Sequence, residues 1–331
     1  MLSGVGATAP RRALIVKLSS LGDVIHTAPV LVDLARAFPG IEIDWVVEEA
    51  FVPLVGCMEG VTRIIPIALR RWRRAPARSR EEMRRCWHEL RDIEYDAVLD
   101  LQGLVKSGLV SRIARGPRYG LGNRTDGASY EPLARLAYDR AIELPPRIHV
   151  VDRSRELASR ALGYPLEGQP VVPWRVPPLH PHDDRWADPD AVLLVHGSAK
   201  AVKTLGPRFW IDLGHELVKE GRRTWLPWGT DEEHARAQHI AQAIGQGAAV
   251  LPRLPLDRLA AVIAASGGAI GLDTGLSHMS ATLGRPTVQI FIEAKAWRAG
   301  VYWEPRTRVL QTSEEEPADI AQTLQAWREV T

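Results

Sequence analysis

Short apolar runs alternate along the chain with longer segments in which apolar residues recur at helical spacing. Apolar runs bounded by turn residues are typical of buried strands and predict them at Ala13–Val16, Ile41–Val47, Arg63–Pro66, Ala97–Leu101, Ala191–Val195, Thr224–Pro227, Gly268–Leu272 and Thr287–Phe291. The amphipathic segments predict helices at Val24–Phe38, Glu81–Arg91, Ser154–Leu162, Pro207–Glu220, Glu232–Ile244, Leu256–Ala265, Leu276–Leu283 and Pro317–Val330. Strands that alternate with helices indicate parallel sheets built from strand–helix–strand units.

A proline-rich stretch with little periodicity, from Tyr164 to Pro189, interrupts this alternation. The chain has 331 residues, a length that favours two domains. We therefore expect an α/β protein with two doubly wound domains and a cleft between the carboxyl ends of their strands, where ligands bind. The expected parts are an N-terminal domain at residues 1–165, a linker at 166–189, a C-terminal domain at 190–312 and a final helical segment at 313–331.

Composition excludes several classes of protein. Hydrophobic residues make up 45% of the chain and charged residues 25%, as in soluble globular proteins and unlike disordered or collagen-like chains. The two cysteines, Cys57 and Cys86, cannot form a disulfide scaffold and fit a reduced cytoplasm. We find neither a signal peptide nor an apolar stretch long enough to span a membrane, so we expect a protein in the cytoplasm or at a membrane surface.

The net charge of +2 is too small for a dedicated nucleic-acid binder, but the kind and position of the cations are informative. Only six of the 42 cationic residues are lysines, a bias that a GC-rich genome also produces. Arginines are densest from Arg70 to Arg80, where no acidic residue intervenes. Because arginine pairs with phosphate and carboxylate through two parallel hydrogen bonds, this run is a candidate anion site, and Trp72 within it fits a sugar ring or a lipid headgroup. RNA is the competing ligand, although we find no second aromatic residue nearby.

The turn at residues 17–26 follows the first strand and opens a helix, the usual place for a phosphate loop. It has neither a GxGxxG fingerprint nor a Walker lysine, which argues against a dinucleotide site and a P-loop. Asp23 fits two roles, the N-terminal cap of the helix or a general base at the edge of a cleft. The residue pattern by itself favours the cap.

Two turns of the second half have features of a phosphate site. Asp273 to His278 lie between a strand and a helix, where free N–H groups and the helix dipole attract phosphate. His196 to Thr204 follow the strand that opens this half and carry hydroxyls and two lysines. The alternatives are a capped helix for the first turn and a solvated loop for the second. Metal ligands are poorly represented, because the acidic pair at Asp188 and Asp190 lies among prolines.

Several segments together resemble the lipopolysaccharide heptosyltransferases of glycosyltransferase family 9: VKLSSLGDVIHTAPVL, IEIDWVVEEAF, RIIPIALRRWRR, LDLQGLVKS, LPWG and LDTGLSHMSATLGRP. The DTGLSH element is similar to the family as a whole, and IPIALRRWRR is similar to its type I enzymes in particular. The resemblance begins near Arg12 and reaches the C-terminus, so only residues 1–11 have no counterpart. It implies a glycosyltransferase B fold, in which two Rossmann-like domains face a central cleft and a C-terminal helix returns toward the N-terminal domain.

The resemblance also implies a reaction. The expected enzyme transfers L-glycero-D-manno-heptose from ADP-heptose to the first 3-deoxy-D-manno-octulosonic acid (Kdo) of Kdo2-lipid A, in the inner core of lipopolysaccharide. Inversion at the anomeric carbon is expected, and neither a metal nor another cofactor. Because the acceptor is a lipid, the protein is expected to bind the cytoplasmic face of the inner membrane peripherally, and no nucleic-acid partner is expected. The alternatives are a related sugar transferase with another nucleotide or acceptor, or a non-catalytic module that binds RNA or anionic lipid.

The resemblance assigns donor-binding residues in the second half. They are Ser198, Ala199, Lys203, Glu233, Asp273, Thr274, Gly275 and His278. Lys203 is expected to neutralise the departing ADP, and Ala199 lacks the hydroxyl of the threonine that the family has there. Glu233 is expected to bind the ribose, with its neighbour Glu232 as the alternative.

The base and the acceptor site are assigned to the first half. Asp23 falls on the catalytic aspartate of the family, which favours the role of base over that of cap. Since an aspartate is a weak base for an alcohol, it is expected to take the proton of the Kdo hydroxyl late in the attack. The acceptor is expected to bind Arg70, Arg71, Arg73 and Arg74, the last of which replaces a lysine.

Overall fold

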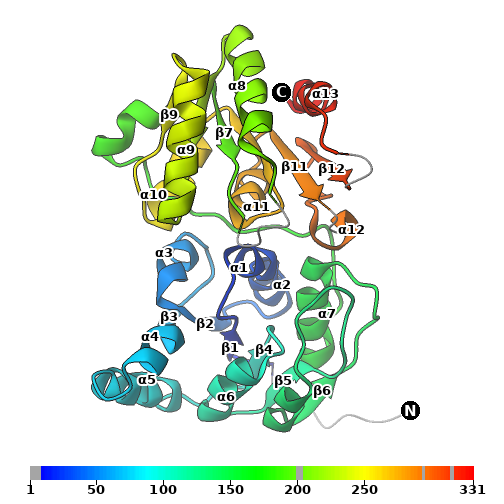
Figure 1. Cartoon of the computed structure of the whole chain (residues 1–331). Coiled ribbons are helices and arrows are strands. Elements are labelled where there is room, and N and C mark those ends of the chain that lie inside the picture. The colour runs from blue at the N-terminus through cyan, green and yellow to red at the C-terminus, as the bar shows by residue number, and fades with distance from the viewer. Residues whose placement is uncertain (1–8, 199–203, 293–294, 314–316) are drawn as a thin grey trace. The chain divides into compact units, whose positions relative to one another are not determined.

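The chain forms two compact units, each built around a six-stranded parallel sheet (Figure 1). The computed structural model describes residues 9–198, 204–292, 295–313 and 317–331. The first unit is Met1–Pro173 and the second unit is Trp174–Thr331, so the boundary falls inside the segment predicted as a linker.

The first unit contains a sheet in the order β3-β2-β1-β4-β5-β6. Its strands are β1 (Arg12–Val16), β2 (Glu42–Glu48), β3 (Arg63–Ile67), β4 (Ala97–Asp100), β5 (Arg118–Leu121) and β6 (Arg140–Ile142). Its helices are α1 (Leu21–Thr27), α2 (Pro29–Ala37), α3 (Val52–Val55), α4 (Leu69–Arg74), α5 (Arg80–Arg91), α6 (Val105–Ile113) and α7 (Val150–Leu162), with the short 3-10 helices η1 (Glu49–Phe51) and η2 (Pro132–Ala137).

The second unit contains a sheet in the order β12-β11-β10-β7-β8-β9. Its strands are β7 (Ala191–Val195), β8 (Arg223–Leu226), β9 (Ala248–Val250), β10 (Gly268–Leu272), β11 (Thr287–Ile292) and β12 (Thr307–Thr312). Its helices are η3 (Pro181–Trp186), α8 (Pro207–Lys219), α9 (Asp231–Ile244), α10 (Leu256–Ala265), α11 (Gly275–Thr282), α12 (Ala296–Ala299) and α13 (Ile320–Val330).

Both sheets have the strand order of a dinucleotide-binding doubly wound sheet when the strands are counted within each unit. In this topology the direction of winding reverses between the first and the fourth strand. These strands are β1 and β4 in the first unit, and β7 and β10 in the second. The loops that leave their carboxyl ends diverge and form the crevice in which such folds bind ligands. The predicted fold class is therefore confirmed.

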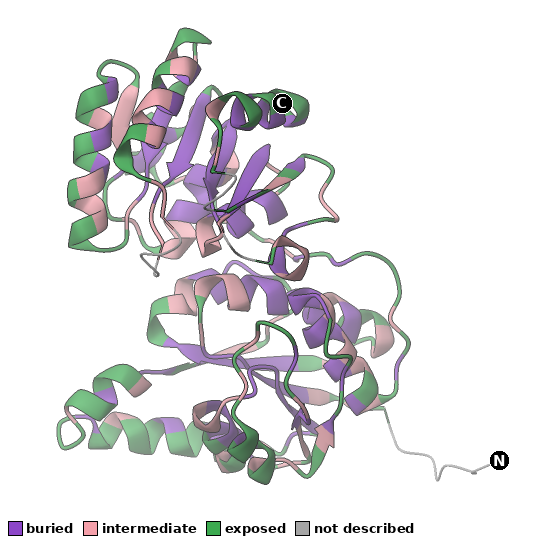
Figure 2. Ribbon diagram, turned by 45° about the vertical axis from the view of Figure 1, so that its right-hand side comes forward, coloured by how far each residue is buried: buried purple, intermediate pink, exposed green. Residues whose placement is uncertain are grey.

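Helices cover both faces of each sheet, which is why the central strands are continuously apolar. In β1, Leu14 and Val16 pack with side chains of α4, α5 and α6, whereas α1, α2 and α7 contact one another as a separate group. In the second unit α8, α9 and α13 share one core with the strands, and α10 contacts α11. Figure 2 shows the buried residues running along the strands of both sheets.

The last helix, α13, belongs to the core of the second unit. Its Leu324 and Trp327 are buried in the cluster that also contains residues of β11 and α8. The return of this helix toward the N-terminal domain stays a prediction.

The structure corrects the sequence-based elements in two ways. The single helix predicted at Val24–Phe38 is wrong, because the segment forms α1 and α2, which meet at Ala28 before Pro29. A proline cannot donate a backbone hydrogen bond and its ring crowds the preceding turn, so the helix restarts there. Strands β5, β6, β9 and β12 lie at or near sheet edges and were not predicted. In β5 the apolar pattern is broken at Gly120, where a Cβ would lie 2.3 Å from the Tyr138 ring.

Candidate active site

The Asp23 carboxylate belongs to the third residue of helix α1, in the loop and helix that follow β1. The N-terminal cap of this helix is Ser20, so the cap role considered for Asp23 falls to that residue. The Asp23 Oδ2 accepts hydrogen bonds from the backbone N–H of Ser20 (3.1 Å) and from the Ser20 hydroxyl (2.8 Å), which forms the capping box of α1. Its Oδ1 faces Lys17 Nζ at 3.7 Å, and 36% of the side chain is exposed. The carboxylate is therefore held in one orientation and remains accessible, so capping does not exclude a role as a base.

Lys17 supplies a nearly buried positive charge beside this carboxylate. Its side chain is 1% exposed, and its Nζ donates to the Leu101 carbonyl at 3.0 Å. Burial raises the pKa of Asp23, but the charges of Lys17 and Arg153 and the hydrogen bonds from Ser20 outweigh it, so the pKa lies below its ordinary value. Asp23 is therefore ionised at neutral pH.

Gln102, which was not among the predicted site residues, fixes the turn that precedes Asp23. The Leu18 N–H donates to its Oε1 at 2.8 Å, and its Nε2 donates to the Ser19 carbonyl at 3.0 Å. Because β4 neighbours β1 in the sheet, the loops after these two strands meet at the same edge. The sequence signals for Gln102 are its place after a predicted strand and within the segment LDLQGLVKS, which resembles the heptosyltransferases.

The first four arginines of the run, Arg70, Arg71, Arg73 and Arg74, lie in helix α4, whereas Arg80 begins α5. These four arginines are not equally available to a ligand. Arg71 donates to both oxygens of Glu49 (3.1 and 2.8 Å) and to both oxygens of Glu82 (2.8 and 2.7 Å). These bonds raise its pKa and, with a further bond from the Trp72 indole, lower the pKa of Glu82 to about 2. An anionic ligand would have to compete with two carboxylates for Arg71. Glu49 precedes the arginine run and Glu82 follows it, so the sequence of the run alone did not indicate these two partners.

Trp72 also lies differently from the sequence-based interpretation. It is buried in the core of the first unit, and its Nε1 donates to Glu82 at 3.0 Å. The indole therefore positions α4 and contributes only part of its surface to the pocket described next.

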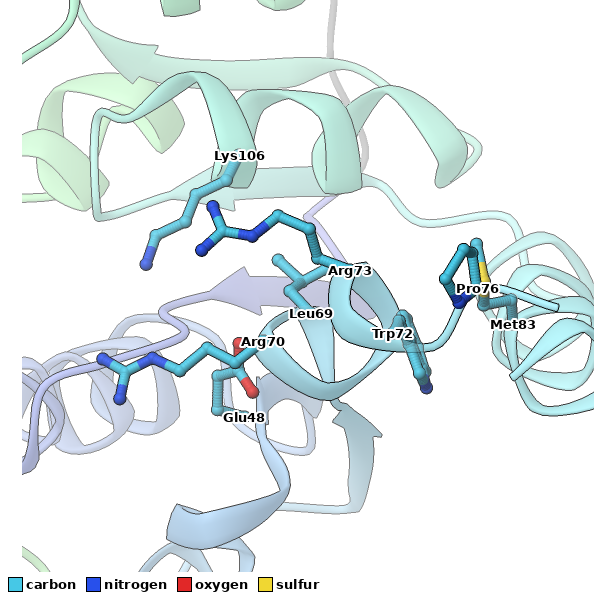
Figure 3. A pocket seen from close by; sticks show the side chains of 8 residues that line it. All are labelled: Glu48, Leu69, Arg70, Trp72, Arg73, Pro76, Met83 and Lys106. Carbon is cyan, nitrogen blue, oxygen red and sulfur yellow. The ribbon is translucent and has the colours of Figure 1, made fainter. Parts of the chain in front are cut away.

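A pocket of about 500 Å³ opens beside α4, a volume typical of small-molecule sites. It is lined by Glu48, Leu69, Arg70, Trp72, Arg73, Pro76, Met83 and Lys106 (Figure 3). Arg70, Arg73 and Arg74 have no carboxylate within ion-pair distance in the described ranges, and Arg74 lies outside the pocket lining. The pocket is therefore cationic at Arg70, Arg73 and Lys106.

Glu48 is the single acid of this lining. It ends β2 and is nearly buried; burial raises its pKa above the ordinary value, although Lys106 and Arg70 act in the opposite direction. In Figure 3 its carboxylate lies near the base of the Arg70 side chain, while Arg73 and Lys106 extend in a common direction. The pocket thus combines cations for an anionic group with an acceptor for hydroxyls.

Lys106 connects the pocket with the Asp23 turn. It lies at the start of α6, after β4, and its Nζ donates to the Ser19 hydroxyl at 3.4 Å. Ser19 directly precedes the cap residue Ser20. The sequence-predicted base and arginines Arg70 and Arg73 are therefore brought to one edge of the first sheet, and Lys106, which was not predicted, lies between them.

His278 in the second unit is held in one tautomer by its neighbours. The Gln289 Oε1 accepts from the Val301 N–H at 2.9 Å, so its Nε2 faces His278 Nδ1, also at 2.9 Å, as the donor. The proton of the imidazole then lies on Nε2, which donates to Asp273 Oδ1 at 3.2 Å. Asp273 is thereby oriented at the carboxyl end of β10.

The turn between β10 and α11 contains groups that are available for hydrogen bonds to a ligand. Thr274 caps α11 without a side-chain bond, and its buried hydroxyl has no hydrogen-bond partner among the described residues. The first N–H groups of a helix lack partners within the helix, so Gly275 and its successors add donors at this point. The turn therefore has the donors that a phosphate requires.

Glu233 differs from Glu232 in its surroundings. Its Oε2 accepts from the N–H groups of Gly229 (2.7 Å) and Thr230 (3.2 Å) in the capping box of α9. Its Oε1 lies against Gly197 in the loop after β7, where a Cβ would approach to 2.4 Å. Glu232 is exposed, so Glu233 is the acid that lies beside this loop.

The loop after β7 is described only in part. Ser198 is half-buried, whereas Ala199 and Lys203 lie outside the described residues. His196, at the start of the loop, is fully buried, which lowers its pKa to about 4, with a further contribution from Arg236. It is therefore neutral at pH 7.

Within the described part of the chain, no group of three or more histidine, cysteine, aspartate or glutamate side chains is arranged to hold a metal ion. None of the helices in these ranges is long and apolar enough to cross a membrane.

Comparison with known proteins gives one consistent result. A family model described as glycosyltransferase family 9 (heptosyltransferase) matches residues 83–326. Lipopolysaccharide heptosyltransferase 1 of Pseudomonas aeruginosa is 40% identical over 296 residues, covering 88% of this chain and 81% of the relative. The protein of the same name from Escherichia coli K12 is 39% identical over 286 residues, covering 85% of this chain and 87% of the relative.

A solved structure, E. coli heptosyltransferase WaaC with ADP, is similar in fold. Its TM-score is 0.84 at 34% sequence identity, over 97% of this chain and all of that one. WaaC with ADP-2-deoxy-2-fluoro heptose has a TM-score of 0.79 at 32% identity, covering 96% of this chain and 99% of that one.

Proposed function

Because the chain belongs to glycosyltransferase family 9, the heptosyltransferases, and is therefore a glycosyltransferase, we propose that it transfers L-glycero-D-manno-heptose from ADP-heptose to the first Kdo of Kdo2-lipid A. The product belongs to the inner core of lipopolysaccharide. The observation that carries the proposal is the Asp23 carboxylate, oriented by Ser20, ionised through Lys17 and linked through Ser19 and Lys106 to a cationic pocket.

The donor is proposed to bind the second unit at the carboxyl ends of β7 and β10. Thr274 and Gly275 would bind the diphosphate through N–H groups at the start of α11 and through the Thr274 hydroxyl, which has no hydrogen-bond partner among the described residues. Glu233 would accept from the ribose, with Oε1 as the oxygen that its capping bonds do not use. Ser198, Ala199 and Lys203 would complete the phosphate site, with Lys203 neutralising the departing diphosphate. Asp273 and His278 would lie beside the transferred sugar.

The acceptor is proposed to bind the pocket of the first unit. Arg70 and Arg73 suit the Kdo carboxylate or a lipid A phosphate, and Arg74 suits a charge outside the pocket. Arg71 is held by Glu49 and Glu82, so we assign it mainly to the positioning of α4.

The transfer itself is proposed to be a single inverting displacement. The Kdo hydroxyl oxygen attacks the anomeric carbon, the bond from that carbon to the diphosphate oxygen breaks, and ADP leaves with the electron pair. The hydroxyl proton passes to Asp23 as it becomes acidic during the attack. Negative charge on the leaving group is stabilised by N–H groups and Lys203.

Replacing Lys17 with methionine is expected to shift the acidic limb of the pH profile to higher pH. The change keeps the length of the side chain but removes the positive charge 3.7 Å from Asp23. This charge lowers the pKa of Asp23 and so counteracts burial, which raises it; without the charge, the pKa of Asp23 rises. Asp23 must be ionised to accept a proton, and activity is therefore lost at a higher pH. The measurement is kcat/KM against pH, with Lys219→Met at an exposed pair as control. Coincident profiles for the wild type and K17M would refute the assignment.

Arg73→Gln is expected to raise the KM for the acceptor by about tenfold or more, with little change in the KM for ADP-heptose. Arg73 lines the pocket and has no carboxylate partner in the described ranges, so its bonds are available to an anion. Steady-state kinetics with each substrate varied in turn measures the effect. Arg71→Gln is the matched control. A larger increase in the KM for the acceptor in R71Q than in R73Q would show that Arg71, and not Arg73, binds the acceptor.

The proposed reaction needs no metal. A chelator such as EDTA is accordingly expected to leave the transfer rate unchanged, because cations and N–H groups stabilise the diphosphate. A rate that falls with EDTA and returns with a divalent cation would show the opposite.

Since the proposed acceptor is a lipid, we also propose that the protein works at the cytoplasmic face of the inner membrane, bound peripherally. The proposed function is tested by incubating the purified protein with ADP-heptose and Kdo2-lipid A and measuring the mass of the product by mass spectrometry. Addition of one heptose is expected. Transfer only from another nucleotide sugar, or only to another acceptor, would identify a related transferase, and RNA binding without any transfer would exclude an enzyme of this kind.

A further inference from the structure

Helix α5 leaves two large apolar side chains in solvent. Met83 is 42% exposed and Trp87 is 48% exposed, and their spacing of four residues places them on one face of the helix. The side of α5 that packs into the first unit carries Cys86 and Leu90. In Figure 2 most of α5 is coloured as exposed. Trp87 is therefore not needed for the core that holds this helix.

Arginines flank Trp87 along the same face. Residues 80, 84, 87 and 91 are separated by intervals of three and four, which bring them into one stripe. The Arg91 guanidinium lies 5.8 Å from the centre of the Trp87 ring. Arg84 pairs with Glu81 at 3.0 Å, whereas Arg80 and Arg91 have no carboxylate within ion-pair distance in the described ranges. We call this stripe, with Met83, the α5 face.

The α5 face is continuous with the proposed acceptor pocket. Met83 belongs to both, since it lines the pocket together with Arg73 and Lys106 (Figure 3). A surface that contacts the α5 face at Met83 therefore also contacts the lining of the pocket at this residue. This matters for an acceptor whose sugar must enter the pocket while its lipid stays in a bilayer.

We propose that the α5 face docks on the anionic surface of a lipid bilayer, with Trp87 at the level of the headgroups. Tryptophan prefers this interface because its ring is apolar with one polar edge, and arginines beside it attract anionic headgroups. RNA fits the face less well, because the α5 face contains one aromatic residue for base stacking, Trp87, and Met83 beside it is purely apolar. This proposal rests on the proposed function, which gives membrane docking its role, but binding to vesicles can be measured without catalysis.

The experiment is co-sedimentation of the full chain with vesicles, one set of phosphatidylcholine alone and one with phosphatidylglycerol added. Wild-type protein is expected to bind the anionic vesicles, and added salt is expected to weaken the binding. The double variant Trp87→Ser with Arg91→Gln is expected to bind at least about tenfold more weakly, because it loses the interfacial ring and one cation. Leu136→Ser, at an apolar residue of η2 that is 82% exposed, is the control and is expected to bind like the wild type.

Three results would overturn the proposal: no binding of wild-type protein to anionic vesicles, equal binding by the double variant, or binding to single-stranded RNA that displaces the vesicles. The proposed function is separated by a second readout, transfer of heptose to a water-soluble Kdo acceptor. Neither Trp87 nor Arg91 lines the pocket, so the double variant is expected to keep this activity. Failure of the wild type in that assay would count against the function and leave the docking result intact.

Discussion

Asp23→Asn is expected to lower kcat by about 10²- to 10⁴-fold, the range that a positioned general base contributes. Asparagine has the same shape as aspartate but cannot take the proton of the attacking hydroxyl. Because Asp23 belongs to the first unit and the donor site to the second, the affinity for ADP-heptose is expected to change little. Single-turnover rates and nucleotide binding, measured on the same preparation, check both parts.

The control separates the base from the cap. Ser20→Ala removes the hydroxyl that donates to Asp23 at 2.8 Å and keeps both the backbone bond and the carboxylate. Loss of a cap of this kind is worth about 1 kcal/mol, so S20A is expected to lose far less activity than D23N. Equal losses in the two variants would reduce Asp23 to a structural residue, and wild-type kcat in D23N would exclude it as the base.

Asp33→Asn is expected to destabilise the first unit by about 3–5 kcal/mol. Asp33 in α2 and Arg155 in α7 form a nearly buried ion pair with two parallel bonds, of 2.8 and 2.9 Å. Removing one charge leaves the Arg155 guanidinium buried without its counter-charge, although it keeps contacts with the Gly168 carbonyl. Urea unfolding of the wild type and the variant measures the difference.

A more exposed ion pair, between Glu156 and Arg160 of α7, is the matched control. Glu156→Gln breaks the bond to Arg160 one turn away, and exposed pairs of this kind are worth about 0.3–0.5 kcal/mol. A similar loss of stability in D33N and E156Q would show that burial does not set the strength of the Asp33–Arg155 pair.

The central strands were predictable because most of their consecutive residues are buried and apolar. Ala13–Val16 are apolar without a break, since helices cover both faces of the sheet. The edge strand β12 carries no such run, and only its first and last residues are buried. The helical spacing of apolar residues continues through Pro29, so it does not indicate the break between α1 and α2. The break arises because proline cannot continue the backbone hydrogen bonds of α1.

The candidate site was predictable where neighbouring residues define it and not where the fold brings residues together. The place of Asp23 after a strand was visible, whereas its contact with Lys17 depends on the path of the turn. The arginine run was visible, but the two acids that hold Arg71 come from η1 and α5. Lys106 reaches the site only because β4 pairs with β1, a neighbourhood that sequence order does not reveal.

The most direct test of the central claim is a crystal structure with ADP-2-deoxy-2-fluoro heptose and a Kdo-containing acceptor. We expect the diphosphate to contact Thr274, Gly275 and Lys203, and the Kdo carboxylate to contact Arg73. We also expect the attacking Kdo hydroxyl to lie within hydrogen-bond distance of Asp23 and to face the anomeric carbon. An acceptor bound with that hydroxyl beyond the reach of Asp23, or a nucleotide bound away from the ends of β7 and β10, would contradict the proposed mechanism.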